Sequence, residues 1–465
     1  MAFFIRNKML GLTITLNTLS WAGLIMRDQY TKTQRIIVRV YGWLVFLYLF
    51  VAATYVQIAD LIDIWGDLDL MAETSLLLFM ELAVISKILT LIFKYDKIME
   101  IINGTEDILC SENRLEGQKI IASIDKETTR FFQYYTSSVI FTTFFWFLGE
   151  HSSTFFIRAK YPFNELKSPG YEFALIHQCM MMVFTGYFEF NINIFFASVV
   201  AGCRCRLKLV ALSLRNICIN IPVNKKNLIT PEEEKLITER LHCAISQHKY
   251  ALDAAEDVKH CLSKVLLVQL TVSIVIICTT AYQMAVNKST DTIQKLSMAG
   301  YLLGASFEVF LFCFQGQSLS NASEDIADAV YECPWYTLTQ PLKRTLLIIM
   351  MRAQSPAILT AGGFVTLDIT EYMAVLTGHG GFGDFLHRTG AEPMAECHHC
   401  GCDLDTVQHT LLVCPAWKGW RRDLVVKIGN DLSSVLWHRC SAATSRGRRC
   451  LTSASAPSRR RRRGA

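Results

Sequence analysis

Long apolar stretches with few or no charged residues recur along the first 375 residues. A helix needs about 20 apolar residues to cross a hydrocarbon core of ~30 Å, and it satisfies its own backbone polar groups there. Six stretches meet or approach this length: 41–59, 74–93, 131–149, 173–203, 265–286 and 296–323. The pattern predicts an all-α membrane protein.

A seventh candidate span is composite. Residues 345–351 are apolar, the segment from Arg352 to Pro356 interrupts them, and the apolar pattern resumes over 357–376 with two embedded acids. Proline cannot donate the backbone hydrogen bond that a continuous helix requires. We therefore expect seven membrane spans, with the last one divided at Pro356.

The longest loop between the spans carries a helix-start signal. Thr230 is placed as an N-cap, Pro231 takes the first helical position and three glutamates follow. We expect a helix over 228–264 that continues out of the bilayer. Its apolar positions recur near helical spacing and predict packing against another helix: Leu236, Leu241, Ala244, Ile245 and Leu252.

Basic residues alternate in density between successive loops, which predicts the orientation. Residues 1–40 hold six Lys and Arg, 94–130 hold six and 204–264 hold eleven, whereas 60–73 hold none and five carboxylates. The N-terminus is therefore expected in the cytoplasm, opposite to a G-protein-coupled receptor. The Asp-Arg-Tyr and Asn-Pro-x-x-Tyr motifs of that class are also missing from the third and seventh spans.

Composition separates the last 90 residues from the rest. The chain is 51% hydrophobic and 19% charged, too apolar for an ordinary soluble protein of 465 residues. Residues 1–375 contain 32 Lys and Arg against 34 Asp and Glu, while 376–465 contain 14 against 7. The net charge of +5 therefore arises entirely in a basic, Cys/His-rich tail.

Single acids lie inside three of the apolar stretches, at Glu81, Glu189 and Glu308. An unpaired charge is costly in hydrocarbon, so these residues reach water near a span end, face a hydrated vestibule or pair with a cation. Lys87, in the same stretch as Glu81, is the candidate cation.

A long motif begins in the sixth span. It reads Phe-Cys-Phe-Gln-Gly-Gln-Ser-Leu-Ser-Asn-Ala-Ser-Glu-Asp-Ile-Ala-Asp-Ala-Val-Tyr-Glu over 312–332, then Pro-Trp-Tyr at 334–336 and Lys-Arg-Thr-Leu-Leu-Ile-Ile-Met-Met-Arg-Ala-Gln-Ser-Pro over 343–356. This segment closely resembles the signature of insect odorant receptors, and the seven-span layout agrees over 1–375. The resemblance implies a multi-pass receptor in the plasma membrane of olfactory sensory neurons. Such a receptor binds volatile odorants and gates a non-selective cation channel as a hetero-tetramer with the family's co-receptor.

The resemblance also implies an apolar odorant pocket in the outer half of the bundle, among spans two, three, four and six. The candidates at that depth are Phe79, Met80, Phe145, Trp146, His177, Met181, Phe184 and Tyr301. Aromatic and methionine side chains suit a volatile ligand, although ordinary bundle packing or lipid contact explains them equally well.

The same resemblance assigns 338–356 to a cytoplasmic half-helix that packs the subunits together, and the following half to the pore. The anchor and pore candidates are Lys343, Arg344, Arg352, Gly362, Gly363 and Tyr372. Cations are costly in hydrocarbon but stable in a cytoplasmic anchor. The glycine pair is expected to permit close helix packing.

The tail carries a second motif, Cys397, Cys400, His409 and Cys414, with intervals of two, eight and four residues. It resembles the CCHC end of the reverse-transcriptase polyprotein of insect non-LTR retrotransposons. Three thiolates and one imidazole close a tetrahedral zinc site, with oxidation of the thiols competing outside the cell. We expect a zinc-knuckle-like segment over 376–430 and a disordered Ser/Arg-rich tail over 431–465.

No enzyme activity is expected, because the aspartate-bearing core of a reverse transcriptase is missing from the sequence. The receptor requires no cofactor. The arginine run at 459–463 suits a solvated tail better than nucleic-acid binding.

The junction between receptor and tail weakens the predicted pore. In the resembled family the pore helix continues past Leu376, where this chain instead has Gly-His-Gly-Gly at 378–381. Glycine disfavours helix, so channel function is expected to be impaired. The alternative is a non-functional chimera of receptor and retrotransposon, or an incorrectly joined gene.

Overall fold

The computed structural model describes residues 8–26, 30–148, 158–164, 167–219, 221, 230–286, 292–363, 365–369, 372, 387, 394–397, 399–403, 409 and 414–418. The chain divides into two compact units, Met1–Leu376 and Thr377–Ala465.

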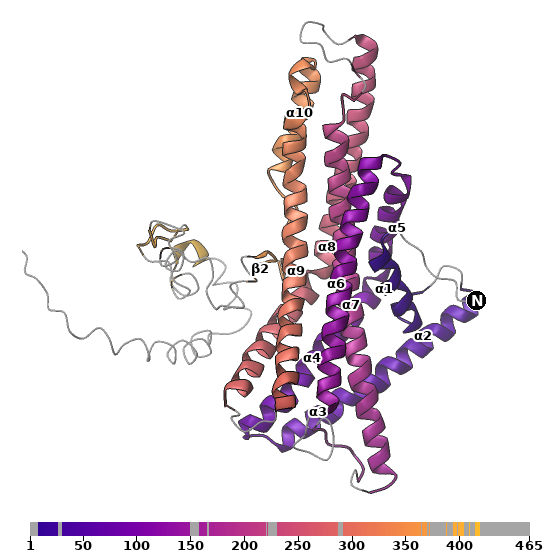
Figure 1. Cartoon of the computed structure of the whole chain (residues 1–465), viewed down its shortest axis with the longest axis vertical. Coiled ribbons are helices and arrows are strands. Elements are labelled where there is room, and N and C mark those ends of the chain that lie inside the picture. The colour runs from indigo at the N-terminus through magenta and orange to yellow at the C-terminus, as the bar shows by residue number, and fades with distance from the viewer. Residues whose placement is uncertain are drawn as a thin grey trace, which may run out of the picture. The chain divides into compact units, whose positions relative to one another are not determined.

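Helices make up nearly all of the first unit, so the all-α prediction is confirmed (Figure 1). In chain order they are α1 (Leu10–Trp21), α2 (Lys32–Phe46), α3 (Ala52–Asp63), α4 (Leu68–Phe93), α5 (Tyr95–Ser111), α6 (Leu115–Leu148), α7 (Gly170–Arg215), α8 (Pro231–Val286), α9 (Thr292–Glu332) and α10 (Gln340–Ala353). A π-helical turn, Leu47–Val51, joins α2 to α3, and a 3₁₀ turn, Trp335–Thr337, precedes α10.

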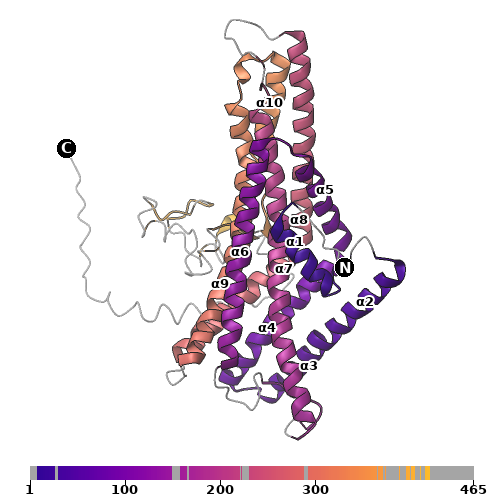
Figure 2. The ribbon, with the colours of Figure 1, turned by 45° about the vertical axis from the view of Figure 1, so that its right-hand side comes forward.

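The long helices α6, α7, α8 and α9 run lengthwise through the unit (Figures 1 and 2). Helix α10 packs beside α9 at one end, and α3 lies at the other. Helix α7 is central, because it packs against α1, α4, α5, α6, α8 and α9. Its buried polar residues, such as Asn191 and Asn193, therefore face other helices rather than lipid.

Four helical segments of the described chain are long and apolar enough to cross a membrane: Lys32–Asp63, Thr74–Phe93, Pro231–Ala281 and Lys295–Glu332. They coincide with four of the predicted spans. Helices α6 and α7 cover the predicted spans 131–149 and 173–203, but they carry more polar side chains. In α7 the polar side chains are explained by its central position among other helices.

Helix α8 confirms the predicted helix after Thr230. Its 56 residues continue without a break from the segment expected outside the bilayer into span 265–286. The Thr230 side chain accepts from the Glu233 backbone N–H at 3.3 Å, and Glu233 accepts from the Thr230 N–H at 2.8 Å, which forms a capping box. Leu241 and Ala244 are buried as expected, whereas Leu236 is exposed.

The prediction that a helix resumes at residue 357 is wrong for residues 357–366. A short hairpin of β1 (Thr360–Ala361) and β2 (Val365–Thr366) follows α10 instead. Gly362 and Gly363 take φ values of 65° and 84°, so they form the tight turn rather than a helix-packing surface. Their lack of a Cβ permits this turn, which an apolar count alone does not reveal. Most of 367–376 lies outside the described residues.

The hairpin is attached to the long helices. The Gly362 N–H donates to the Ser263 carbonyl of α8 at 2.8 Å. On the other side, Gly316 of α9 approaches the chain just after β2, where a Cβ on residue 316 would lie 2.1 Å from the Leu367 carbonyl oxygen. Only glycine allows this close approach.

Candidate functional site

A buried ionic cluster joins three helices inside the bundle. Lys87 of α4 is only 1% exposed, and its Nζ donates to Glu189 Oε1 of α7 at 2.5 Å and to Glu308 Oε1 of α9 at 2.9 Å. Of the three alternatives open for the intramembrane carboxylates, pairing with Lys87 is the one that these two adopt. The cluster holds two carboxylates and one ammonium, so either one carboxyl is neutral or the cluster is negative.

Neutral polar side chains extend the cluster to a fourth helix. The Asn193 amide, one turn after Glu189, donates to Glu308 and, at 3.1 Å, to the Tyr135 hydroxyl of α6. Tyr135 is itself buried. Every member of the cluster therefore has a partner on another helix, as buried charges require.

A cavity of about 130 Å³ lies against this cluster. Five helices contribute to it, namely α4, α6, α7, α8 and α9. Most of its wall is apolar, including Leu77, Met80, Val139, Met181, Val272 and Ile276. Its polar lining includes Glu81, Tyr135, Thr185, Glu189, Gln269 and Glu308. An apolar cavity of roughly 150 Å³ holds benzene, so this one suits a small volatile molecule.

Three of the eight odorant-pocket candidates line this cavity: Met80, Met181 and Tyr301. The Tyr301 hydroxyl lies 3.4 Å from the Met80 sulfur. Phe79 packs in the same small apolar cluster as Met80 and Tyr301 without lining the cavity. These four candidates therefore lie at or beside the cavity, and their role in odorant binding stays a prediction.

Phe145, His177 and Phe184 do not line the cavity. The Phe145 ring packs on Phe141 with centroids 4.6 Å apart, and the Phe184 ring lies near Tyr187. His177 Nδ1 is 2.9 Å from the Tyr161 hydroxyl. The Trp146 side chain lies outside the described residues.

Several lining residues were missed at the sequence level. Tyr135, Thr185 and Gln269 are uncharged polar residues in three different predicted spans, and nothing in their spacing marks them as neighbours. Glu81 was noticed as a carboxylate, but Lys87 pairs with Glu189 and Glu308 instead. Glu81 accepts only a long 3.4 Å hydrogen bond from Thr54 of α3.

A larger groove of about 780 Å³ opens between α2 and α5. Arg35, Arg39, Asp96 and Glu100 line it, and these charges suit an apolar ligand less well than the smaller cavity does.

The anchor candidates lie on α10 or after it. Lys343 is half-buried, while Arg344 and Arg352 are exposed, and the Arg352 guanidinium donates to the Ser355 carbonyl at 2.7 Å. The Tyr372 ring packs on Phe310 of α9 with centroids 5.4 Å apart. Helix α10 also exposes a row of apolar side chains, Leu347, Ile348 and Met351.

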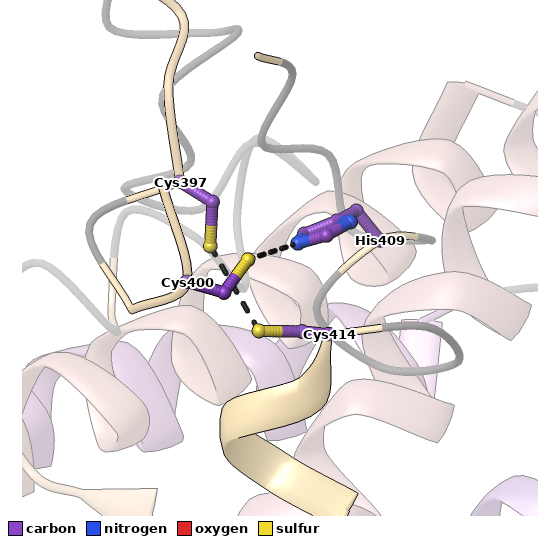
Figure 3. Close-up of side chains that lie close together, drawn as sticks. All are labelled: Cys397, Cys400, His409 and Cys414. Carbon is purple, nitrogen blue, oxygen red and sulfur yellow. Dashed lines mark hydrogen bonds between the residues drawn. The ribbon is translucent and has the colours of Figure 1, made fainter. Parts of the chain in front are cut away.

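The second unit contains the four CCHC side chains close together, all pointing toward a common centre (Figure 3). Cys397 Sγ lies 3.9 Å from Cys414 Sγ, and Cys400 Sγ lies 3.1 Å from His409 Nε2. All four ligand atoms are within 4.8 Å of one another. Zinc with Zn–S bonds of about 2.3 Å separates two tetrahedral thiolates by about 3.8 Å, so these residues fit the ion.

A family model described as 7tm Odorant receptor matches residues 67–379, about two thirds of the chain. The chain belongs to the odorant receptor family. It is therefore a multi-pass membrane protein of a receptor family, and not an enzyme.

Curated relatives and solved structures are similar at low identity. Odorant receptor 22c of Drosophila melanogaster is 23% identical over 195 residues, which are 42% of this chain and 48% of the relative. The odorant receptor coreceptor of Aedes aegypti is 25% identical over 150 residues, which are 32% of this chain and 31% of the relative. The chain thus spans at most about half the length of these relatives.

The olfactory receptor OR5 from Machilis hrabei has a similar fold, with a TM-score of 0.65 at 18% identity, covering 79% of this chain and 94% of that chain. A complex of that receptor with eugenol gives a TM-score of 0.65 at 17% identity.

Proposed function

We propose that this chain is an odorant-binding subunit of a cation channel, used in the perception of smell. The observation that carries the proposal is the small, mostly apolar cavity lined by five helices beside the Lys87 cluster. Its size and walls match the chemistry of a volatile ligand. The eugenol complex of the similarly folded receptor OR5 supports an odorant as the occupant. Met80, Met181 and Tyr301 are the contacts that we propose for it.

The subunit partner that we propose is the odorant receptor co-receptor, in a hetero-tetramer in the plasma membrane of olfactory sensory neurons. The exposed apolar row on α10 supports this, because Leu347, Ile348 and Met351 are 56%, 65% and 63% exposed in one subunit. Such a row beside exposed cations marks a protein interface outside the bilayer. The basic loops support a cytoplasmic N-terminus, which also places α10 in the cytoplasm.

Conduction is the part of this function that we expect to be impaired. The glycine-rich sequence at 378–381 disfavours a continued pore helix, so we propose that the full chain binds odorant but conducts poorly. The change of sequence character after Val375 favours the alternative, a non-functional chimera of receptor and retrotransposon or an incorrectly joined gene. A single transcript that contains both the receptor segment and the tail would contradict an incorrectly joined gene.

Co-expression with the co-receptor and current recording under an odour panel tests the receptor function. The full chain is expected to reach the membrane with small or absent currents. A variant whose tail after Val375 is replaced by the pore helix of a related receptor is expected to respond. A silent replacement variant that reaches the cell surface would contradict the receptor proposal.

We also propose that the tail binds one zinc ion. The geometry of the four ligand atoms supports this, since Cys397 and Cys414 are buried and Gly401, at φ 69°, turns the chain between the ligands. Bound zinc would hold Cys397, Cys400, His409 and Cys414 in one tetrahedron and so stabilise this segment.

Metal analysis of the purified full chain by mass spectrometry is expected to give one zinc per chain. Cys414→Ser should lose it, whereas Cys402→Ser should keep it, because Cys402 is exposed and outside the cluster. Equal zinc content in both variants would contradict the assignment.

A further inference from the structure

The cavity presents more negative and hydrogen-bond-accepting groups than the protein itself satisfies. Three carboxylates line it, Glu81, Glu189 and Glu308, and none of the described lining residues is Lys, Arg or His. Lys87 supplies a single ammonium and bonds to two of the three. The remaining carboxylate, Glu81, has no cationic partner among the described residues.

Glu81 is positioned to bind a ligand. It is 1% exposed, so the bulk solvent does not stabilise its ionised form. Its Oε2 accepts the 3.4 Å bond from Thr54, and its Oε1 has no hydrogen-bond partner. A buried carboxylate oxygen without a donor is unfavourable, and a ligand that brings a donor or a positive charge to it removes that penalty.

Two further polar atoms of the cavity lack partners. The Gln269 carbonyl oxygen and the Thr185 hydroxyl are buried without a hydrogen bond, and both residues line the same cavity. Gln269 is 4% exposed and Thr185 is 1% exposed. The unpaired Gln269 and Glu81 oxygens are acceptors, and the Thr185 hydroxyl can also accept. These atoms therefore complement a ligand that carries several N–H donors.

The rest of the wall restricts the size and shape of the ligand. Leu77, Met80, Val272 and Ile276 offer hydrocarbon contact within about 130 Å³. This volume holds one six-membered ring or a short branched chain, by comparison with the ~150 Å³ cavity that holds benzene. A ligand with one charged end and one compact apolar end fits both parts of the wall.

We propose that the cavity selects small volatile amines, with the ammonium group against Glu81 and the hydrocarbon group against the apolar wall. The proposal rests on the proposed odorant-binding function and names the ligand class of that site. The ammonium donates to Glu81 Oε1 and to the Gln269 oxygen, and the ligand charge balances the excess carboxylate. Neutral hydrocarbons of the same size bind through the apolar wall alone and therefore more weakly.

Direct binding to the full chain in lipid nanodiscs tests this selectivity without depending on conduction. Cyclohexylamine, cyclohexanol and methylcyclohexane are matched probes, since each places one heavy atom on a six-membered ring. Ligand-observed NMR gives the Kd of each. We expect the amine to bind at least tenfold more tightly than methylcyclohexane at neutral pH, where it is protonated.

Glu81→Gln keeps the size of the side chain and removes its charge. The amine should lose most of its advantage in this variant, to about twofold or less, while the Kd of methylcyclohexane stays within twofold. Glu172→Gln is the matched control, because Glu172 is exposed at the start of α7 and does not line the cavity. It should retain the full preference for the amine.

The outcomes separate the two proposals. Equal Kd values for the three probes in the wild-type chain, or an amine preference that survives Glu81→Gln, would overturn the amine selectivity while leaving odorant binding intact. Failure of all three probes to bind the folded chain would count against odorant binding in this cavity, and the selectivity would fall with it.

Discussion

The buried position of Lys87 makes its removal far more damaging than the removal of an exposed lysine. In Lys87→Met the Glu189 and Glu308 carboxylates lose the cation that they share, together with hydrogen bonds of 2.5 and 2.9 Å. Removing one partner of a buried ion pair costs about 3–5 kcal/mol of stability, because the remaining charge stays buried. We expect Lys87→Met to lose a free energy of unfolding in this range.

Lys97 is a closely matched control for this prediction. Its Nζ also contacts two carboxylates, Glu100 at 3.1 Å and Asp257 at 3.0 Å, but its side chain is 42% exposed. Lys97→Met should therefore leave stability nearly unchanged, since water and salt replace the pairing.

Unfolding by SDS titration in mixed micelles, followed by circular dichroism, measures both variants. The triple variant Lys87→Met/Glu189→Gln/Glu308→Gln should recover most of the loss, because it removes the unpaired charges. The account of the cluster would be refuted if Lys87→Met cost no more than Lys97→Met, or if the triple variant were no more stable than Lys87→Met.

The same titration tests other parts of the fold. Gly316→Ala should lower the free energy of unfolding by about 1–3 kcal/mol, because its Cβ would lie 2.1 Å from the Leu367 carbonyl oxygen. Gly104→Ala, with nothing within 4 Å of the added Cβ, should raise it by about 0.5–1 kcal/mol. Equal effects would contradict the close approach at Gly316. Burial, reinforced by the Arg352 charge, lowers the pKa of His248 below its ordinary value of about 6.5. The stability that neutral His248 contributes is therefore present above about pH 6.5 and lost as the pH falls through the lowered folded pKa. His248→Gln should lose less stability than the wild type on acidification. Parallel losses in the two proteins would contradict this. Finally, the exposed Cys243 of α8 should react with a membrane-impermeant thiol reagent only after the cells are opened. Labelling of Cys243 itself in intact cells, located by peptide mapping, would contradict the predicted orientation.

Hydropathy and capping signals in the sequence predicted much of the helical architecture. Apolar side chains are favoured both against lipid and inside the bundle. A membrane span therefore appears in the sequence as an apolar run, whichever of the two its helix faces contact. The N-cap of α8 is equally local, since the Thr230 and Glu233 side chains accept from each other's backbone N–H groups. Features that depend on neighbouring residues alone could therefore be predicted without a structure.

Rotation of each helix about its axis could not be predicted in the same way. Phe79 and Met80 are neighbours on α4, at nearly the same depth, yet Met80 lines the cavity and Phe79 does not. Counting residues along a span gives depth but not direction. The polar groups of Tyr135, Asn193 and Gln269 become neighbours of one site only when α6, α7 and α8 pack together.

The hairpin after α10 was misinterpreted for a different reason. Residues 357–376 contain enough apolar residues for a span, and the glycine pair was assigned to helix packing. Two successive glycines between Thr-Ala and Phe-Val-Thr also favour a turn with positive φ, which is the conformation they adopt. A count of apolar residues cannot decide between a spanning helix and a hairpin, whereas the hydrogen bond from Gly362 to Ser263 supports the hairpin.

Filling the cavity tests the central claim, that a volatile ligand binds between these five helices, most directly. Ala305 lies in the wall, and Ala305→Phe places a ring in the available volume, whereas Ala281→Phe adds the same ring on an exposed part of α8. The Kd of cyclohexylamine for each full-length variant in nanodiscs is the measurement. The account predicts at least a tenfold weaker Kd for Ala305→Phe and an unchanged Kd for Ala281→Phe. Equal binding by the two folded variants would contradict it.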